Sequence, residues 1–264
     1  MIELRDVHVT FNKDTPLETR ALRGVDLSVP EGQFLTIIGS NGAGKSTALN
    51  VLAGLAPVER GSVTLDAADV TSWPVHRRAH LISRVFQDPK MGTCEDLTII
   101  ENFALAHGRT APKGFRFAID RGMRGEIAER IRILGLGLED RLDDKVGLLS
   151  GGQRQAVSLM MATTGETRVL LLDEHTAALD PKTADFVLDT TRTIVDKLSL
   201  TAVMVTHSMG QALSTGERTV MFHRGKIIFD AAGEERAAMS VEDLLHLFKR
   251  TQGEELSDDS LLLG

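Results

Sequence analysis

The chain of 264 residues is 42% hydrophobic and 25% charged. This length and hydrophobic content are sufficient for one α/β domain with a full hydrophobic core. Its formal net charge of -7 argues against a nucleic-acid-binding protein, because affinity for a phosphate backbone depends on dense Lys and Arg. No apolar run approaches the roughly 18 to 20 residues that span a bilayer, so any membrane role is expected to come through a partner.

The first part of the chain is predicted to consist mostly of strands. Alternating apolar residues indicate strands over 4–11 and 22–27, and the solid apolar run at 34–38 is typical of a strand that is buried on both faces. A glycine-rich loop follows this run. A helix is then expected from about Lys45 to Leu52.

The middle of the chain, from about residue 90 to 165, places its apolar residues on helical faces. This segment is predicted to be a helical subdomain that is inserted into the sheet domain, with its last helix beginning near Ser150. The α/β alternation then resumes, with a strand at 169–172, a helix from Pro181 to about Leu198, a strand at 201–205, a strand pair over 218–230 that turns at Arg224-Gly225, and a helix over 241–249.

These elements predict a core made of residues 1–89 and 166–250, with the helical subdomain at 90–165. The acidic, turn-rich tail of residues 251–264 is expected to be disordered.

The glycine-rich loop fits the phosphate-loop pattern G-x-x-x-x-G-K-[ST]. Its glycines allow successive backbone N–H groups to point at phosphate oxygens. The positive end of the dipole of the following helix adds to the positive potential at this point. Lys45 is expected to reach the β- and γ-phosphates of ATP, and the Ser46 hydroxyl is expected to bind Mg²⁺. The residues assigned to nucleotide binding are Gly39, Ser40, Asn41, Gly42, Ala43, Gly44, Lys45, Ser46 and Thr47.

Two acidic residues end the apolar run at 169–172, in the form known as Walker B. Because this run is predicted to be a strand beside the phosphate loop, Asp173 is expected to hold Mg²⁺. Glu174 is then placed to polarise the attacking water as a general base.

The sequence Leu149-Ser150-Gly151-Gly152-Gln153 separates this chain from other phosphate-loop enzymes. It resembles the signature of the ABC ATPases, and the resemblance covers residues 1 to about 250. Physically, the motif forms a second helix N-terminus that can bind phosphate, through a serine hydroxyl, glycine N–H groups and the helix dipole. The family resemblance implies a dimer of two copies of the chain, arranged head to tail, in which Ser150, Gly151, Gly152 and Gln153 cap the nucleotide held by the partner.

The same resemblance implies the fold and further site residues. The fold is a P-loop NTPase (RecA-like) core sheet, with an N-terminal antiparallel β subdomain and the inserted helical signature subdomain. Gln87 resembles the Q-loop glutamine that contacts Mg²⁺ or water, and Asp180 resembles the D-loop residue that crosses the dimer interface. His207 resembles the switch histidine that contacts the γ-phosphate. Phe11 matches the aromatic residue that stacks on adenine, although its position would equally suit a core residue.

One departure from the family pattern is His175, which stands where most members have proline after the catalytic glutamate. We expect this histidine to be a surface turn residue. The surrounding stretch, 173–181, resembles a subgroup of bacterial importer ATPases that is sometimes labelled for amino acids. That resemblance implies a separate integral membrane permease, an extracytoplasmic substrate-binding protein, and a peripheral location on the cytoplasmic face of the membrane.

The alternative is a soluble ABC ATPase without a transport role, such as the iron–sulfur cluster assembly type. On the transporter hypothesis, the permease is expected to contact the stretch from Asp88 to Thr98. Met91 and Leu97 would then supply apolar contacts, since methionine adapts well to a partner's shape. The competing interpretation is that these two side chains fill the core of the helical subdomain.

Overall fold

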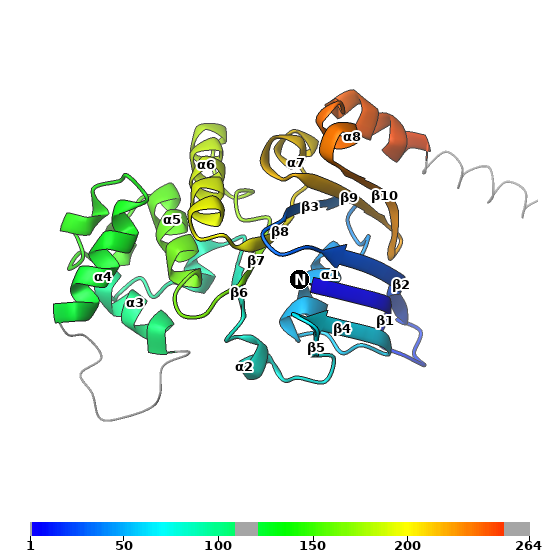
Figure 1. The fold of residues 1–264 in the computed structure, drawn as a ribbon, viewed down its shortest axis with the longest axis horizontal. Helices are drawn as coiled ribbons and strands as arrows, with labels where there is room; N and C mark the ends of the chain where they lie inside the picture. The colour runs from blue at the N-terminus through cyan, green and yellow to red at the C-terminus, as the bar shows by residue number, and fades with distance from the viewer. Residues whose placement is uncertain (1, 109–120, 251–264) are drawn as a thin grey trace, which may run out of the picture.

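Two sheets organise the computed structural model, which describes residues 2–108 and 121–250 (Figure 1). The predicted tail at 251–264 lies outside the described residues. The first sheet is antiparallel, with the order β2-β1-β4-β5, and consists of β1 (Ile2–Phe11), β2 (Thr19–Val29), β4 (Arg60–Leu65) and β5 (Ala68–Asp69). The predicted N-terminal antiparallel sheet is therefore present.

The second sheet has the order β10-β9-β3-β8-β7-β6. Five neighbouring strands run parallel, and only the pair of β9 and β10 is antiparallel. Together with the helices that cover this sheet, the arrangement confirms the predicted α/β class. The strands are β3 (Phe34–Gly39), β6 (Ile82–Val85), β7 (Val169–Asp173), β8 (Thr201–Val205), β9 (Arg218–His223) and β10 (Lys226–Ala232).

Strand β7 and most of β3 and β8 are apolar because both faces of the sheet are buried there. In β7, Leu170 and Leu172 pack into a core shared with the helices between β6 and β7, whereas Val169 and Leu171 face the antiparallel sheet. Helix α1 (Lys45–Ala53) fills the space between the two sheets with residues that include Leu49 and Leu52. This burial explains why the apolar runs are continuous rather than alternating.

A group of helices is inserted between β6 and β7, two strands that are direct neighbours in the sheet. Figure 1 shows this group, in green, beyond the edge of the parallel sheet. The boundaries of the helical subdomain at residues 90 and 165 remain a prediction. The inserted elements are η1 (Pro89–Gly92), α3 (Ile99–Gly108), α4 (Arg121–Arg132), η2 (Leu138–Asp140), η3 (Val146–Leu148) and α5 (Gly151–Ala162).

Outside the inserted group, the two helices predicted after residue 180 lie close to their predicted positions, whereas α2, α7 and α8 were not predicted. The long helix α6 is capped by Asp180 and runs one residue short of the predicted end. The turn between β9 and β10 lies at Arg224 and Gly225, with φ angles of 45° and 78°, as tight hairpins require. The helices are α2 (Val75–Arg78), α6 (Pro181–Lys197), α7 (Met209–Thr215), α8 (Gly233–Ala237) and a helical stretch over 241–250. None of the helices within the described ranges has both the length and the apolar character that a membrane crossing needs.

Candidate nucleotide-binding site

Four of the predicted motifs gather at one edge of the parallel sheet. Strands β3, β8, β7 and β6 are consecutive neighbours and run in the same direction, so their carboxyl ends meet at that edge. The phosphate loop follows β3, and His207 comes two residues after β8. Asp173 ends β7, and Gln87 comes two residues after β6. The crevice outside the carboxyl ends of parallel strands is where open α/β sheets bind ligands.

The phosphate loop can take its path only because it contains glycine. Gly39 has a φ of 146°, and a Cβ atom there would overlap the carbonyl oxygen of Phe222 on β9. Gly44 has a φ of 104°, and a Cβ atom would lie 2.6 Å from the carbonyl oxygen of Ala21. Gly44 also caps helix α1, which begins at Lys45. The loop therefore packs closely against the backbone at Phe222 and at Ala21, and its N–H groups lie at the N-terminus of α1.

Lys45 is buried at the base of this loop. Its Nζ atom donates hydrogen bonds to the carbonyl oxygens of Gly39 (2.8 Å) and Ser40 (2.9 Å). Burial lowers the pKa of Lys45, and the nearby carboxylates of Glu174 and Asp173 partly oppose that effect. The ammonium group therefore lies within the electrostatic reach of both acids that end β7. Of the other loop residues, Asn41, Gly42 and Ser46 are exposed, Thr47 is half-buried, and Ala43 is buried.

Glu174 occupies a backbone conformation that is uncommon for a residue with a side chain. Its φ is 50°, and its N–H donates to the carbonyl oxygen of Val205 at the end of β8 (3.0 Å). The bend brings its Oε1 atom to 2.6 Å from Nε2 of His207. Left-handed conformations of non-glycine residues are enriched at functional sites, where the surrounding structure holds them.

Three oxygen-bearing side chains fit the predicted magnesium site. The hydroxyl of Ser46, the carboxylate of Asp173 and the amide of Gln87 are hard oxygen donors, which Mg²⁺ prefers. Mg²⁺ bound with nucleotide usually takes only one or two protein carboxylates, because water and phosphate oxygens fill its other positions. The donor set at this edge of the sheet matches that chemistry.

The signature residues lie elsewhere, at the start of α5. The Ser150 side chain accepts a hydrogen bond from the Gln153 N–H (3.3 Å), and the Gln153 side chain accepts one from the Ser150 N–H (3.1 Å). This reciprocal pair is a capping box, which fixes the first turn of the helix. The Ser150 hydroxyl keeps its own proton as a donor for a ligand, and Gly151 is exposed beside it.

Asp180 lies close to the signature through the start of α6. It caps that helix by accepting the Thr183 N–H (3.1 Å), and its bonds with Thr183 lower the pKa of its carboxyl group. A Cβ atom at Gly152 would overlap the Thr183 side chain. Glycine at position 152 therefore allows α5 and α6 to pack together at the point where both helices begin.

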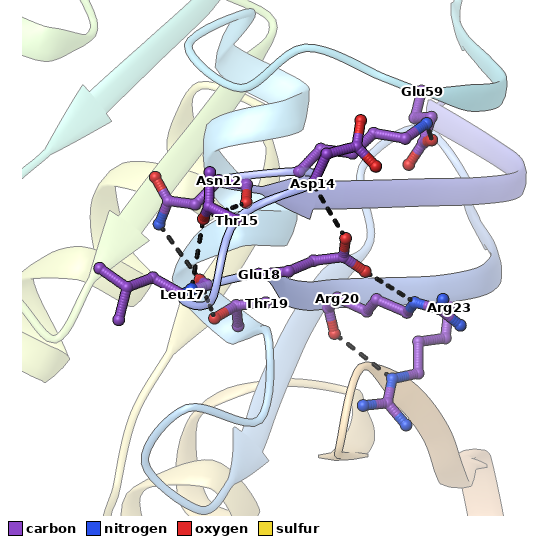
Figure 2. A network of polar contacts seen from close by, with 10 residues as sticks. Asn12, Asp14, Thr15, Leu17, Glu18, Thr19, Arg20, Arg23 and Glu59 are labelled. Carbon is purple, nitrogen blue, oxygen red and sulfur yellow. Dashed lines mark hydrogen bonds and ion pairs between the residues drawn. The ribbon is translucent and has the colours of Figure 1, made fainter.

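Phe11 lies at the end of β1, and its side chain is 37% exposed. The structure therefore removes the alternative in which Phe11 is a core residue. The loop that follows is folded by polar contacts (Figure 2), including Thr15 Oγ1 donating to the carbonyl oxygen of Asn12 (2.7 Å) and the Asp14 N–H donating to Glu18 (3.1 Å). These contacts order the loop between β1 and β2 that follows the exposed Phe11.

The prediction for His175 is wrong, because this residue is buried rather than exposed. The turn after Glu174 folds inward against α6, and His175 Nε2 lies 3.0 Å from Thr191 Oγ1. The Thr191 hydroxyl donates its own proton to the carbonyl oxygen of Val187 (2.7 Å), so it accepts the proton on His175 Nε2. Burial lowers the pKa of His175 to about 4.

The sequence interpretation missed Arg84, which forms an ion pair with Asp173. Arg84 lies in β6, between the buried residues Ser83 and Val85. The signal was present in the sequence, since an arginine within a short buried strand needs a partner. The partner could be identified only once β6 was placed beside β7.

The stretch proposed to contact a permease forms one side of a groove. Met91 is exposed, and Leu97 is half-buried. The interpretation of Met91 as a core residue is therefore wrong. The groove has a volume of about 310 Å³ and lies between η1, α3 and α5, and its lining includes Arg84, Met91, Cys94, Asn102, Leu105 and Met161.

Comparison with known proteins gives consistent matches. A sequence model of the family described as ABC transporter matches residues 22–177. A tyrosine transport ATP-binding protein of Clostridioides difficile is 37% identical over 249 residues, which cover 94% of this chain and 99% of that protein. A spermidine/putrescine import ATP-binding protein of Haemophilus influenzae is 32% identical over 235 residues, which cover 89% of this chain and 59% of that protein.

Solved structures match over nearly the whole chain. A dimeric ATP-binding cassette in a post-hydrolysis state, bound to ADP and phosphate, is 28% identical with a TM-score of 0.74, and the match covers 88% of this chain and 98% of that one. An ATP-binding cassette of an ABC transporter in its ADP conformation has a TM-score of 0.79 at 24% identity, covering 94% of this chain and 98% of that one. The second likeness supports the fold alone.

Proposed function

The chain belongs to the ABC transporter family as an ATP-binding subunit, and on that premise we propose that the edge formed by β3, β8, β7 and β6 is its site of ATP hydrolysis. The chain is an ATPase of the type that drives transport. One observation carries the assignment of the site: four neighbouring parallel strands bring the phosphate loop, His207, the acidic pair and Gln87 to the same edge.

Each residue at this edge has a proposed role. The loop of residues 39–47 and Lys45 bind the phosphates, and Glu174 accepts a proton from the attacking water. His207 contacts the γ-phosphate and, at 2.6 Å, holds the Glu174 carboxylate in place. Ser46, Asp173 and Gln87 would hold Mg²⁺, which when bound neutralises charge on the β- and γ-phosphates. Phe11 stacks on the adenine ring.

The site becomes complete when two copies of the chain associate head to tail. The signature helix start offers the Ser150 hydroxyl and the exposed Gly151 N–H, and these groups cap the nucleotide held by the partner's phosphate loop. Asp180, which is exposed beside the signature, lies at the same interface. The dimeric state of a solved relative that is 28% identical supports this arrangement.

The transport role that we propose is uptake of an amino acid or a related small molecule. The names of the two relatives described above, a tyrosine transport protein and a spermidine/putrescine import protein, support uptake of small nitrogen-containing compounds. An importer of this type works with an integral membrane permease and an extracytoplasmic substrate-binding protein. The chain would then sit on the cytoplasmic face of the membrane, bound through the permease.

The groove beside η1 is the proposed docking surface for the permease. Its exposed Met91 and Leu105 offer apolar contact to a short cytoplasmic helix. Gln87 lies just before η1, so closure around the nucleotide would also move one wall of the groove.

Co-purification tests the transport proposal. The chain is expressed together with the permease that a neighbouring gene encodes, and complexes are isolated through a tag on the permease. Met91→Glu is expected to release the chain from the permease while nucleotide binding by the isolated chain stays unchanged. Leu55→Glu, which places the same charge at an exposed leucine outside the groove, is the matched control and should remain bound. If the wild-type chain never co-purifies with a membrane protein, the transport proposal fails and the chain is assigned as a soluble ABC ATPase.

A further inference from the structure

Arg84 connects three parts of the nucleotide site. Its Nη2 atom forms an ion pair with Oδ2 of Asp173, and its Nη1 atom donates to Oδ1 of Asn50 at 2.6 Å. The guanidinium group also lies over the ring of Phe86, 5.1 Å from the centroid. The Arg84 side chain is only 14% exposed. It is therefore held from three directions, by α1, β7 and the segment that leads to Gln87.

Two of these contacts connect elements that carry proposed magnesium ligands. Asn50 lies four residues after Ser46 on α1, so both side chains are on the same face of that helix. Asp173 ends β7. The two Nη atoms of Arg84 therefore join the helix that carries Ser46 to the strand that carries Asp173.

The chemistry of arginine suits this connection. The guanidinium group is planar and presents several N–H donors at fixed angles, so its two ends can hold two acceptors at a defined separation. Within the described residues its Nε atom is buried without a hydrogen-bond partner. The orientation of the guanidinium group is therefore set by the two Nη contacts and by the ring of Phe86.

On the assumption that the proposed ATP site is correct, we propose that Arg84 is a positioning residue for the magnesium site. It fixes the Asp173 carboxylate relative to α1, so that Asp173 and Ser46 are correctly spaced before Mg²⁺ and nucleotide arrive. The ion pair engages Oδ2 of Asp173, and a carboxylate has a second oxygen that can bind a metal ion or its water. Arg84 thus orients the ligand without replacing the metal.

The test measures how much Mg²⁺ strengthens nucleotide binding. The dissociation constant of a non-hydrolysable ATP analogue is determined by calorimetry with Mg²⁺ and again with EDTA. The magnesium effect is the value with EDTA divided by the value with Mg²⁺. In Arg84→Gln this ratio is expected to fall by about 10- to 100-fold, the usual cost of losing a residue that orients a metal ligand. The affinity in EDTA should stay close to that of the wild type.

A second variant separates positioning from charge. Asn50→Leu keeps the Arg84 cation but removes its anchor on α1, so a reduced ratio in this variant indicates positioning. Arg168→Gln is the matched control, because Arg168 pairs with Asp66 at the opposite end of β7 and its loss removes the same charge. The control ratio should equal that of the wild type.

Two results would overturn the inference. One is a wild-type ratio in Arg84→Gln, which an equal loss of affinity with Mg²⁺ and with EDTA would also give. The other is a larger ratio, which would mark Arg84 as a competitor of Mg²⁺. If Arg84→Gln does not fold, an unchanged ratio in Asn50→Leu overturns it. If the wild-type chain binds no analogue under either condition, the proposed ATP site fails instead.

Discussion

The Oε1 atom of Glu174 lies 2.6 Å from the Nε2 atom of His207. The two residues follow neighbouring parallel strands, and the Glu174 N–H is also bonded to the end of β8. The proposed general base is therefore fixed to the strand that leads to His207 by its backbone as well as by its side chain. This contact places the two residues so that a γ-phosphate touching His207 would be close to the base.

Replacement of Glu174 by glutamine should separate binding from hydrolysis. Glutamine keeps the shape of the side chain but cannot accept the proton of the attacking water, so turnover should fall by about 10²- to 10⁴-fold. ATP should still bind, and a closed dimer should accumulate. Phosphate release and gel filtration with Mg-ATP measure both effects. Glu166→Gln, at an exposed carboxylate before β7, should behave as the wild type. An active, monomeric Glu174→Gln variant would contradict the assignment.

Complementation between two inactive variants should reveal the composite site. Lys45→Ala removes the charge that binds phosphate, and Ser150→Arg blocks the signature that caps the partner's nucleotide. Each variant alone should be inactive, whereas mixing them should restore one intact site per heterodimer. The activity of the wild-type chain per molecule should also rise with protein concentration. Flat activity across dilution, with no rescue on mixing, would place catalysis within single chains.

Removal of the Phe11 ring should weaken nucleotide binding. The expected loss for Phe11→Ala is about 1 to 3 kcal/mol, the value of one base–aromatic stacking contact. The measurement is the dissociation constant of ATP, with circular dichroism to confirm the fold. Leu17→Ala is the control, because Leu17 is an exposed apolar residue of the same loop. Equal losses in the two variants would mean that the loop, and not the ring, contributes to binding.

His175 should make the free energy of unfolding depend on pH. Burial lowers its pKa from 6.5 to about 4, so between these values the unfolded chain binds a proton that the folded chain does not. Stability is therefore fully present above pH 6.5 and falls as the pH decreases through this window. Because a shift of one pKa unit corresponds to about 1.4 kcal/mol, the free energy of unfolding should fall by about 2 kcal/mol between pH 7.5 and 5.

Urea unfolding at those two pH values measures this contribution. His175→Asn retains an N–H donor for Thr191 but does not titrate in this range. Between pH 7.5 and 5, its free energy of unfolding should therefore fall by about 2 kcal/mol less than that of the wild type. Parallel losses in the two proteins would show that His175 does not contribute the pH dependence.

The sequence predicted the elements of the fold better than their arrangement. The apolar run at 34–38 and the glycines around Lys45 are local signals, because burial on both faces and positive φ angles restrict which residues can stand there. The position of β3 between β8 and β9 depends on contacts with residues far along the chain. No local pattern contains that information.

The same distinction separates the parts of the site. Lys45, Glu174 and His207 were identified because each stands in a motif, whereas Arg84 stands in none and is recognised by its partners on two other elements. His175 was misplaced because a polar residue in a turn is usually exposed, and its burial depends on how α6 packs against that turn.

The position of β3 has a consequence for synthesis on the ribosome. Both strands that flank it, at 201–205 and 218–223, are made long after residues 34–39. This buried strand therefore leaves the exit tunnel without either neighbour, and it stays unpaired until residues 201–223 have been made. Segments of this kind are prone to aggregate and are substrates for chaperones. ATP can stabilise the nascent protein only after that point, since the strands that hold the phosphate loop in place are made long after the loop itself.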